Sequence, residues 1–219
     1  MSAKIVTVFN QKGGAGKTSL AMLLAGTLGL RGKSRVEVID MDIQGTAVRW
    51  ASLAPDDAPF PAAVVSLAQM GGRMHREVRN HIDNFDYIII DCPPNIESPV
   101  PSSAMLISDL VLIPTVLAPA DLWAVVGAKM LAQTAMDQNE TLKLRIVPNM
   151  VQRKTSMAQA ALAQLALDTA APLSKSSLAL RTIYREAQAL GSPVQWMPRS
   201  GDATEEIESL ATEVLALLK

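Results

Sequence analysis

A glycine-rich stretch near the N-terminus, residues 12–19, contains the residue types that bind a chain of phosphates. It lies between an apolar β-branched run, residues 5–9, and a stretch with helical spacing, so backbone N–H groups of the turn and of the helix N-terminus can surround an anion. Lys17 is placed to reach the β- and γ-phosphates, and the Thr18 hydroxyl to complete a Mg²⁺ shell. The predicted nucleotide contacts here are Lys12, Gly13, Gly14, Ala15, Gly16, Lys17, Thr18 and Ser19.

Acidic residues end two further apolar runs. Asp91 follows residues 87–90, and Asp40 and Asp42 follow residues 36–39. Because the carboxyl ends of parallel strands form the ligand-binding edge of an open α/β sheet, we expect these carboxylates near the glycine-rich turn. Asp91 is the candidate that holds Mg²⁺ through water.

The glycine-rich stretch departs from the usual G-x-x-x-x-G-K-[ST] pattern. Its first glycine position is Gln11, and a second lysine, Lys12, precedes the paired glycines. This K-G-G-x-G-K-T arrangement resembles the deviant Walker A box of the ParA/MinD family of ATPases. The resemblance implies an ATP-hydrolysing enzyme that uses ATP and Mg²⁺. It also implies that Lys12 reaches across a nucleotide-sandwich homodimer to a phosphate on the opposite subunit, in the manner of an arginine finger.

Residues 40–45 resemble the D-x-D-P-Q-G switch of ParA-like proteins, with Ile43 in place of the proline. By that resemblance Asp42 orients the attacking water and takes part in the Mg²⁺ site, while Asp40 supports it. The predicted catalytic residues are therefore Lys12, Lys17 and Asp42. The predicted metal-site residues are Thr18, Asp42 and Asp91.

The resemblance extends to residues 108–122 and 184–194, which look like the corresponding parts of small ParA proteins, the ParF-like branch. It implies that Asn149 hydrogen-bonds the adenine and that Pro198 packs against the same base. It further implies that Asp121 caps a helix near the dimer face.

The elements that must position these residues alternate along the chain. Continuous apolar runs predict strands covered on both faces, and apolar residues at three- and four-residue steps predict helices between them. The predicted fold is α/β, a doubly wound, mostly parallel sheet with helices on both faces, of the deviant P-loop NTPase type, in one domain over residues 1–219. The predicted strands are residues 5–9, 36–39, 64–67, 87–90, 110–113, 145–147 and 194–197. The predicted helices are residues 17–30, 73–81, 120–135, 156–168 and 180–190, and one that opens at Asp202 with a capping-box-like Glu205.

Charge is balanced over the whole chain but not along it. The 20 Lys and Arg and 21 Asp and Glu give a net charge of −1, which excludes a constitutively basic nucleic-acid binder. Residues 129–199 nevertheless contain nine basic and four acidic side chains. In this segment Lys175, Arg181 and Arg185 are candidate contacts for non-specific DNA, which dimerisation would double. Arg153, Lys154 and Arg199 add to the same basic segment.

Several classes of protein are disfavoured. Cys92 is the only cysteine, so the chain has no internal disulfide framework and cannot supply the paired cysteines of an iron–sulfur carrier. The most apolar stretch, residues 110–120, is shorter than the about 20 residues that a membrane-spanning helix needs. The C-terminal helix contains Glu205, Glu206, Glu208 and Glu213, which anionic lipid would repel. We therefore expect a cytoplasmic protein without a membrane partner.

Three functions remain open. The leading one is a ParA-type ATPase on the nucleoid that dimerises on ATP, binds DNA without sequence preference, and positions or segregates a cargo. The cargo is a plasmid or a protein body such as a carboxysome, and a ParB-like protein or cargo adaptor stimulates hydrolysis. The second is a MinD-like, membrane-associated regulator of the division site. The third is a metabolic ATP-dependent ligase on the same fold.

Overall fold

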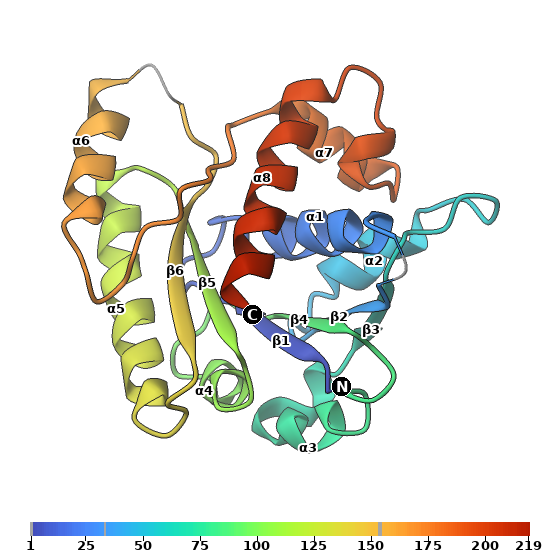
Figure 1. Ribbon diagram of the computed structural model, residues 1–219, viewed down its shortest axis with the longest axis horizontal. Coiled ribbons are helices and arrows are strands. Elements are labelled where there is room, and N and C mark those ends of the chain that lie inside the picture. Colours follow the sequence, from blue (N-terminus) through green and yellow to red (C-terminus); the bar gives the residue numbers. More distant parts are fainter. Residues whose placement is uncertain (1, 33, 153–154) are drawn as a thin grey trace.

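A single parallel sheet organises the computed structural model, which describes residues 2–32, 34–152 and 155–219 (Figure 1). Its six strands, in the described part of the chain, follow the order β3-β2-β4-β1-β5-β6, and each pairing is parallel. The strand bounds are β1 Lys4–Val8, β2 Val36–Asp40, β3 Ala63–Ser66, β4 Tyr87–Asp91, β5 Leu110–Thr115 and β6 Lys143–Pro148. The order reverses direction between β4, β1 and β5, so the loop after β1 lies at the switch point where such sheets bind ligands.

Helices cover both faces of the sheet. One core contains buried residues of α3, α4, α5 and α6, and the other contains buried residues of α1, α2, α7 and α8. The helices are α1 Lys17–Leu30, α2 Thr46–Ser52, α3 Met74–Val78, α4 Pro99–Met105, α5 Pro119–Met136, α6 Ser156–Ala166, α7 Thr182–Ala189 and α8 Gly201–Leu217. Two 3₁₀ helices, η1 Ala68–Arg73 and η2 Val194–Trp196, complete the elements. The prediction of a doubly wound α/β fold is confirmed.

The central strands are apolar throughout because they supply both cores. On β4, Ile88 and Ile90 point into the core beneath α3 to α6, whereas Ile89 points into the other core. Successive strand residues alternate between faces, so a strand covered on both sides needs apolar residues at every position. Ile88, Ile89 and Ile90 are each fully buried.

One predicted strand is absent. Residues 194–197 contain η2 instead, and Val194 and Met197 pack into the core beneath α1 and α8 without joining the sheet. The outer edge of β6, where a further strand would pair, is already occupied: Ile146 N donates to Pro172 O and Ser174 N donates to Ile146 O. An apolar run alone does not distinguish a strand from a buried turn.

The last helix also differs from its prediction. α8 begins at Gly201 after Ser200, and no side chain caps its first turn, so the capping box at Asp202 is wrong. Three carboxylates of α8 have partners within the molecule: Glu206 and Glu208 form ion pairs with arginines, and Glu213 accepts a hydrogen bond from the Ser174 hydroxyl. In place of the predicted helix over residues 73–81 the structure has the shorter α3, and it contains two helices that the sequence analysis does not predict, α2 and α4. No helix in the described part of the chain is long and apolar enough to cross a bilayer.

Candidate functional site

The glycine-rich loop connects β1 to α1, as the sequence predicts. Gly14 and Gly16 have φ of 80° and 84°, in the left-handed region that glycine tolerates best. No side chain caps the N-terminus of α1, so the N–H groups of its first turn are not taken by a capping side chain. The start of this 14-residue helix is therefore able to hold an anion.

Asn149, at the end of β6, supports the loop directly. Its Nδ2 donates to the carbonyl of Ala15 at 2.9 Å, and its Oδ1 accepts from the N–H of Met150 at 3.0 Å. The approach is so close that a Cβ on Gly16 would lie 2.2 Å from Asn149 Nδ2. This contact gives Asn149 a role in shaping the phosphate loop, whereas its contact with adenine stays a prediction.

A second asparagine, Asn10, anchors the start of the loop and was missed by the sequence reasoning. Asn10 is fully buried, its Nδ2 donates to Pro114 O at 2.8 Å, and its Oδ1 accepts from the Lys12 N–H at 3.0 Å. A polar residue directly after an apolar strand and before a glycine-rich turn is the signal that could have identified it. Asn10 and Asn149 thus join the loop to β5 and β6, the strands on one side of β1.

Lys17 lies beneath the loop and is nearly buried. Its Nζ donates to the Lys12 carbonyl at 3.1 Å. Burial lowers the pKa of Lys17, and the neighbouring Asp91, Asp42 and Cys92 act in the opposite direction. The ammonium of Lys17 is therefore shielded from water and lies near two carboxylates. Because charges interact more strongly away from water, this position strengthens its attraction to an incoming phosphate.

Asp91 is the last residue of β4, at the edge of the sheet where the phosphate loop lies. Neither carboxylate oxygen has a hydrogen-bond partner among the residues that the structure describes, although the side chain is fully buried. Burial raises the pKa of Asp91 to about 7, an effect that the Thr18 hydroxyl and Lys17 reduce. A buried carboxylate whose oxygens have no hydrogen-bond partner at close range, next to the Thr18 hydroxyl and the phosphate loop, fits Mg²⁺, which prefers oxygen ligands and retains several waters.

Asp40 and Asp42 have different environments. Asp40 is fully buried, and its Oδ2 accepts from the N–H groups of Ala47 and Val48 at 2.9 and 3.2 Å, so it holds the start of α2. Asp42 is half-buried, and its Oδ1 accepts only from the Gln44 N–H at 2.9 Å among the described residues. The strand register places Asp40 beside Asp91, so the loop with Asp42 follows at the same edge.

The Lys12 side chain points toward α5. Its Nζ lies 2.7 Å from Asp121 Oδ2, with 38% of the Lys12 side chain and 8% of the Asp121 side chain exposed. The prediction that Asp121 caps a helix is wrong, because Ala118 occupies the N-cap position of α5 and no side chain caps it. Asp121 lies in the first turn and binds the lysine instead.

The remaining predicted residues lie apart from this group. Pro198 is exposed in the turn between η2 and α8, and its contact with adenine stays a prediction. Lys175 and Arg185 are exposed. Arg181 precedes the first turn of α7 and pairs with Glu206 at 2.9 Å and Asp202 at 3.2 Å, so its charge is largely neutralised. Arg153 and Lys154 lie outside the described residues.

The chain is similar in sequence to known nucleotide-binding proteins. The model of the CobQ/CobB/MinD/ParA nucleotide binding domain matches residues 6–194. The "Maintenance of carboxysome distribution protein A" of Halothiobacillus neapolitanus is 28% identical over 96% of this chain and 95% of its own length.

Solved structures of low sequence identity share the fold. The Cyanothece McdA–ATP complex superposes with a TM-score of 0.81 at 16% identity, over 99% of this chain and 97% of that chain. The cell division ATPase MinD of Pyrococcus furiosus superposes with a TM-score of 0.78 at 20% identity, over 98% and 99% of the two chains. The domain match over residues 6–194 shows that the chain belongs to the CobQ/CobB/MinD/ParA nucleotide-binding family.

Proposed function

We propose that this chain is a ParA-type ATPase, acting as one domain over residues 1–219, that positions a cargo by cycling between an ATP-bound dimer and a monomer. The observation that carries the proposal is the placement of Lys12. Lys17 lies beneath its own phosphate loop, whereas the Lys12 ammonium is held at Asp121 on the outer side of that loop, partly open to solvent. Such a partly exposed lysine can exchange Asp121 for a phosphate of a nucleotide held by another copy of the chain.

The surface beside Lys12 supports a dimer. Trp123 is 74% exposed and Ile96 is 38% exposed, and both line the same hollow as Gln11 and Lys12. Large exposed apolar side chains next to a functional loop are typical of protein–protein contact surfaces. A second copy facing this hollow would cover these side chains and bring its own Lys12 toward the nucleotide.

Each of these residues has a role in the proposed hydrolysis reaction. The Asp42 carboxylate orients a water, whose oxygen attacks the γ-phosphorus as the bond to the β-phosphate oxygen breaks, yielding ADP and inorganic phosphate. Lys17 of the same chain and Lys12 of the second copy stabilise the negative charge that develops. Asp91 and Thr18, with Asp42, would hold Mg²⁺, which neutralises phosphate charge when bound.

The cycle would serve transport of a cargo along DNA. The relative from Halothiobacillus neapolitanus, named for carboxysome distribution, supports a protein body as the cargo, and a plasmid is the other cargo of this type. In this proposal the ATP-bound homodimer binds nucleoid DNA non-specifically in the cytoplasm. A ParB-like protein or cargo adaptor stimulates hydrolysis and release.

The test is the oligomeric state of the purified protein with ATP or ADP, measured by size-exclusion chromatography with light scattering. We expect a dimer with Mg²⁺-ATP and a monomer with ADP. The Lys12→Ala variant should bind a fluorescent ATP analogue yet remain a monomer. Lys4→Ala is the matched control, because Lys4 forms a similar surface pair with Asp109 at 2.8 Å. A wild-type protein that stays monomeric with ATP would contradict the proposal.

A further inference from the structure

Three arginines form a row on α3 and its two flanking residues. Arg73, Arg76 and Arg79 are all exposed, whereas Met74 and Val78 on the other side of the helix are fully buried. Arg73 and Arg79 keep helical backbone angles at the two ends of α3. Residues three apart on a helix are neighbours, about 5–6 Å apart at Cβ, so Arg76 is a neighbour of both Arg73 and Arg79. We call this group the α3 arginine row.

The α3 arginine row is not neutralised by the protein. Within the residues that the structure describes, none of its three guanidiniums has an ion pair or a hydrogen bond to an acidic side chain. The acidic residue within α3, Glu77, lies 4.0 Å from the Nε2 of His81. By contrast, acidic side chains form ion pairs with Lys4, Lys12, Arg31, Arg35, Lys129 and Arg181.

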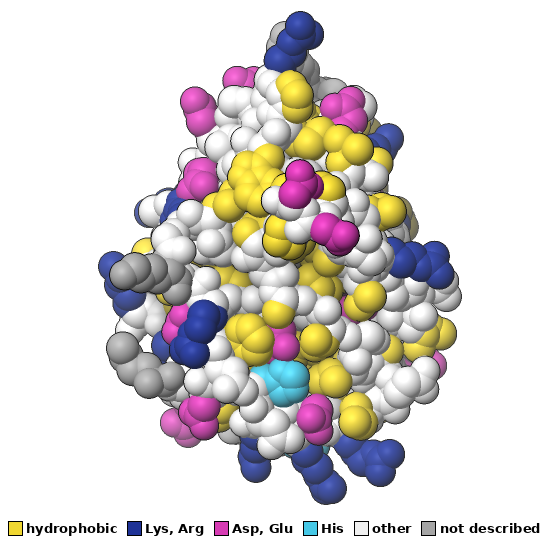
Figure 2. Space-filling view, turned by 90° about the vertical axis from the view of Figure 1, so that its right-hand side faces the viewer, with side chains coloured by type: hydrophobic (Ala, Val, Ile, Leu, Met, Phe, Trp, Pro, Cys, Tyr) yellow, Lys and Arg dark blue, Asp and Glu magenta, His cyan; other side chains and the backbone are white. Residues whose placement is uncertain are grey.

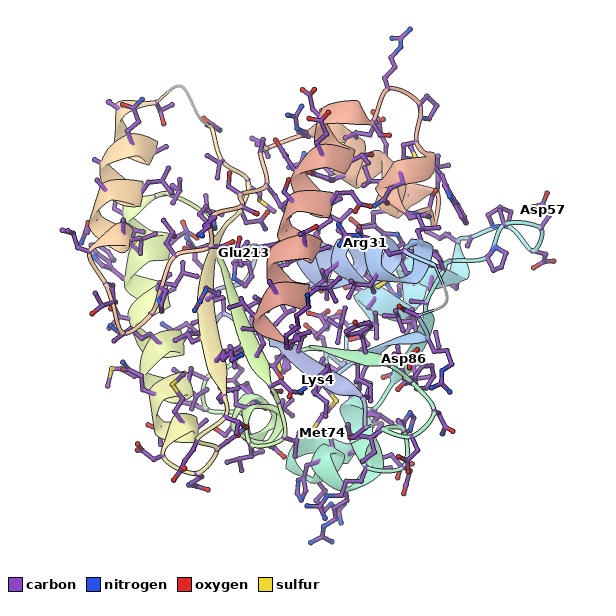
Figure 3. The ribbon with its side chains drawn as sticks, in the orientation of Figure 1. Lys4, Arg31, Asp57, Met74, Asp86 and Glu213 are labelled. Carbon is purple, nitrogen blue, oxygen red and sulfur yellow. The ribbon has the colours of Figure 1, made fainter. Side chains whose placement is uncertain are left out.

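The row lies away from the phosphate loop. After α3 the chain meets the beginning of β1, where Ala3 N donates to Ile82 O and Lys4 N donates to Asp86 O, each at 2.9 Å. The phosphate loop follows the opposite end of β1. Figure 1 places α3 at the lower end of the molecule, where Lys and Arg side chains project in Figure 2, and Figure 3 labels Met74 and Lys4 in this region. A dimer that buries the phosphate loop therefore leaves the row accessible.

The chemistry of the row selects its ligand. A duplex carries one negative charge per about 1.7 Å of helix axis, so adjacent guanidiniums can contact successive phosphates without reading a sequence. A membrane-binding helix needs an exposed apolar face to insert, and on α3 the apolar side chains are in the core. Arg181, one of the DNA contacts predicted from the sequence, is instead paired with Glu206 and Asp202.

We propose that the α3 arginine row binds the phosphate backbone of duplex DNA. This inference rests on the proposed function, whose non-specific DNA contact it assigns to α3. The row acts as three point contacts per protomer and six per dimer, and its strength falls with salt because each contact releases a counterion.

The test is the binding of a fluorescein-labelled duplex of arbitrary sequence to the full chain with Mg²⁺-ATP, followed by anisotropy over a salt series. In the variant R73Q/R76Q/R79Q we expect affinity at low salt to fall by about tenfold or more. The slope of log K against log salt should decrease by about 0.9 for each arginine lost, or about 2.7 per protomer. The variant K175Q/R185Q/R199Q removes the same charge from the competing basic segment, residues 129–199, and should change the slope less; an equal or larger change there would overturn the assignment to the row. Thermal midpoints of both variants should match the wild type, because all six side chains are exposed.

The outcomes separate this inference from the proposed function. A wild type that binds the duplex with an unchanged slope in R73Q/R76Q/R79Q would overturn the role of the row and leave the proposed function standing. A wild type that dimerises on ATP but binds no duplex would remove both. Loss of binding to phosphatidylglycerol vesicles in R73Q/R76Q/R79Q, with duplex binding retained, would assign the row to lipid and also overturn the inference.

Discussion

The Nζ of Lys12 lies 2.7 Å from the Oδ2 of Asp121, so the lysine expected to reach a second subunit is bound within its own chain. The two residues belong to the phosphate loop and to the first turn of α5, and α5 approaches the loop closely at Gly127, where a Cβ would lie 2.6 Å from Gln11 Oε1. Reaching a second copy requires this ion pair to break. In the proposed dimer we therefore expect the pair to oppose dimerisation until nucleotide phosphates offer Lys12 a stronger partner.

Asp121→Asn should make dimerisation easier. The substitution removes the charge that holds Lys12 but keeps the shape of the side chain. A partly exposed pair of this kind contributes up to about 1 kcal/mol, and a symmetric dimer breaks two of them, so the protein concentration for half-maximal dimer with ATP should fall by up to about thirtyfold. Sedimentation velocity at several protein concentrations measures the midpoint. Asp109→Asn, which breaks the surface pair with Lys4, serves as the control, and an equal midpoint in wild type and Asp121→Asn would exclude a restraining role for the pair.

Gly16→Ala should damage both the loop and its binding of ATP. The new Cβ would lie 2.2 Å from Asn149 Nδ2, at a backbone φ of 84° that alanine adopts only with strain. We expect a loss of about 2 kcal/mol in the free energy of unfolding and at least tenfold weaker ATP binding. Urea denaturation and isothermal titration measure the two effects. Gly201→Ala, where a Cβ meets nothing within 4 Å and φ is not positive, should leave both quantities close to wild type.

Asp91→Asn should remove a pH dependence of stability. The folded pKa of about 7 lies above the ordinary value of 3.8, so the folded state binds one more proton than the unfolded state between these pH values. The contribution of Asp91 to stability is thus present at low pH and is lost as pH rises toward 7, by an amount on the order of 4 kcal/mol.

The measurement is urea denaturation between pH 5 and pH 8 in EDTA, without nucleotide. The difference in stability between Asp91→Asn and the wild type should grow in favour of the variant as pH rises. Parallel curves would show that Asp91 does not carry this proton. Mg²⁺-ATP should narrow the difference at pH 8, because the cation then compensates the buried charge.

Asp40→Asn should mainly lower the stability of the fold, whereas Asp42→Asn should mainly lower the rate of ATP hydrolysis. Asp40 accepts three N–H groups, from Asp42, Ala47 and Val48, and an asparagine can replace only part of that acceptor capacity. We expect Asp40→Asn to cost about 1–3 kcal/mol of stability. Asp42→Asn should leave stability unchanged and reduce ATP turnover by about a hundredfold or more. Comparable stability losses in both variants would contradict this division.

Much of the site could be predicted from residues that are close in the sequence. The phosphate loop, Lys17 and Thr18 belong to one strand–turn–helix unit, whose geometry depends on nearby glycines and on the helix that follows. Asp91 and Asp42 could be placed because parallel strands end at one edge, whatever their order in the sheet. The prediction of a strand at residues 194–197 was wrong because apolar composition does not reveal that the edge of β6 is already covered.

The sequence by itself determined the family, the alternation of strands and helices, and the residues that meet at the phosphate loop, since these follow from local spacing and from the direction of the strands. The tertiary structure decided which of those residues are already engaged. Asn149 reaches the carbonyl of Ala15 from 134 positions away, Lys12 pairs with Asp121, and Arg181 is neutralised while the α3 arginine row is not. Such pairings depend on which strands become neighbours and how closely the helices pack, and no short stretch of sequence contains that information.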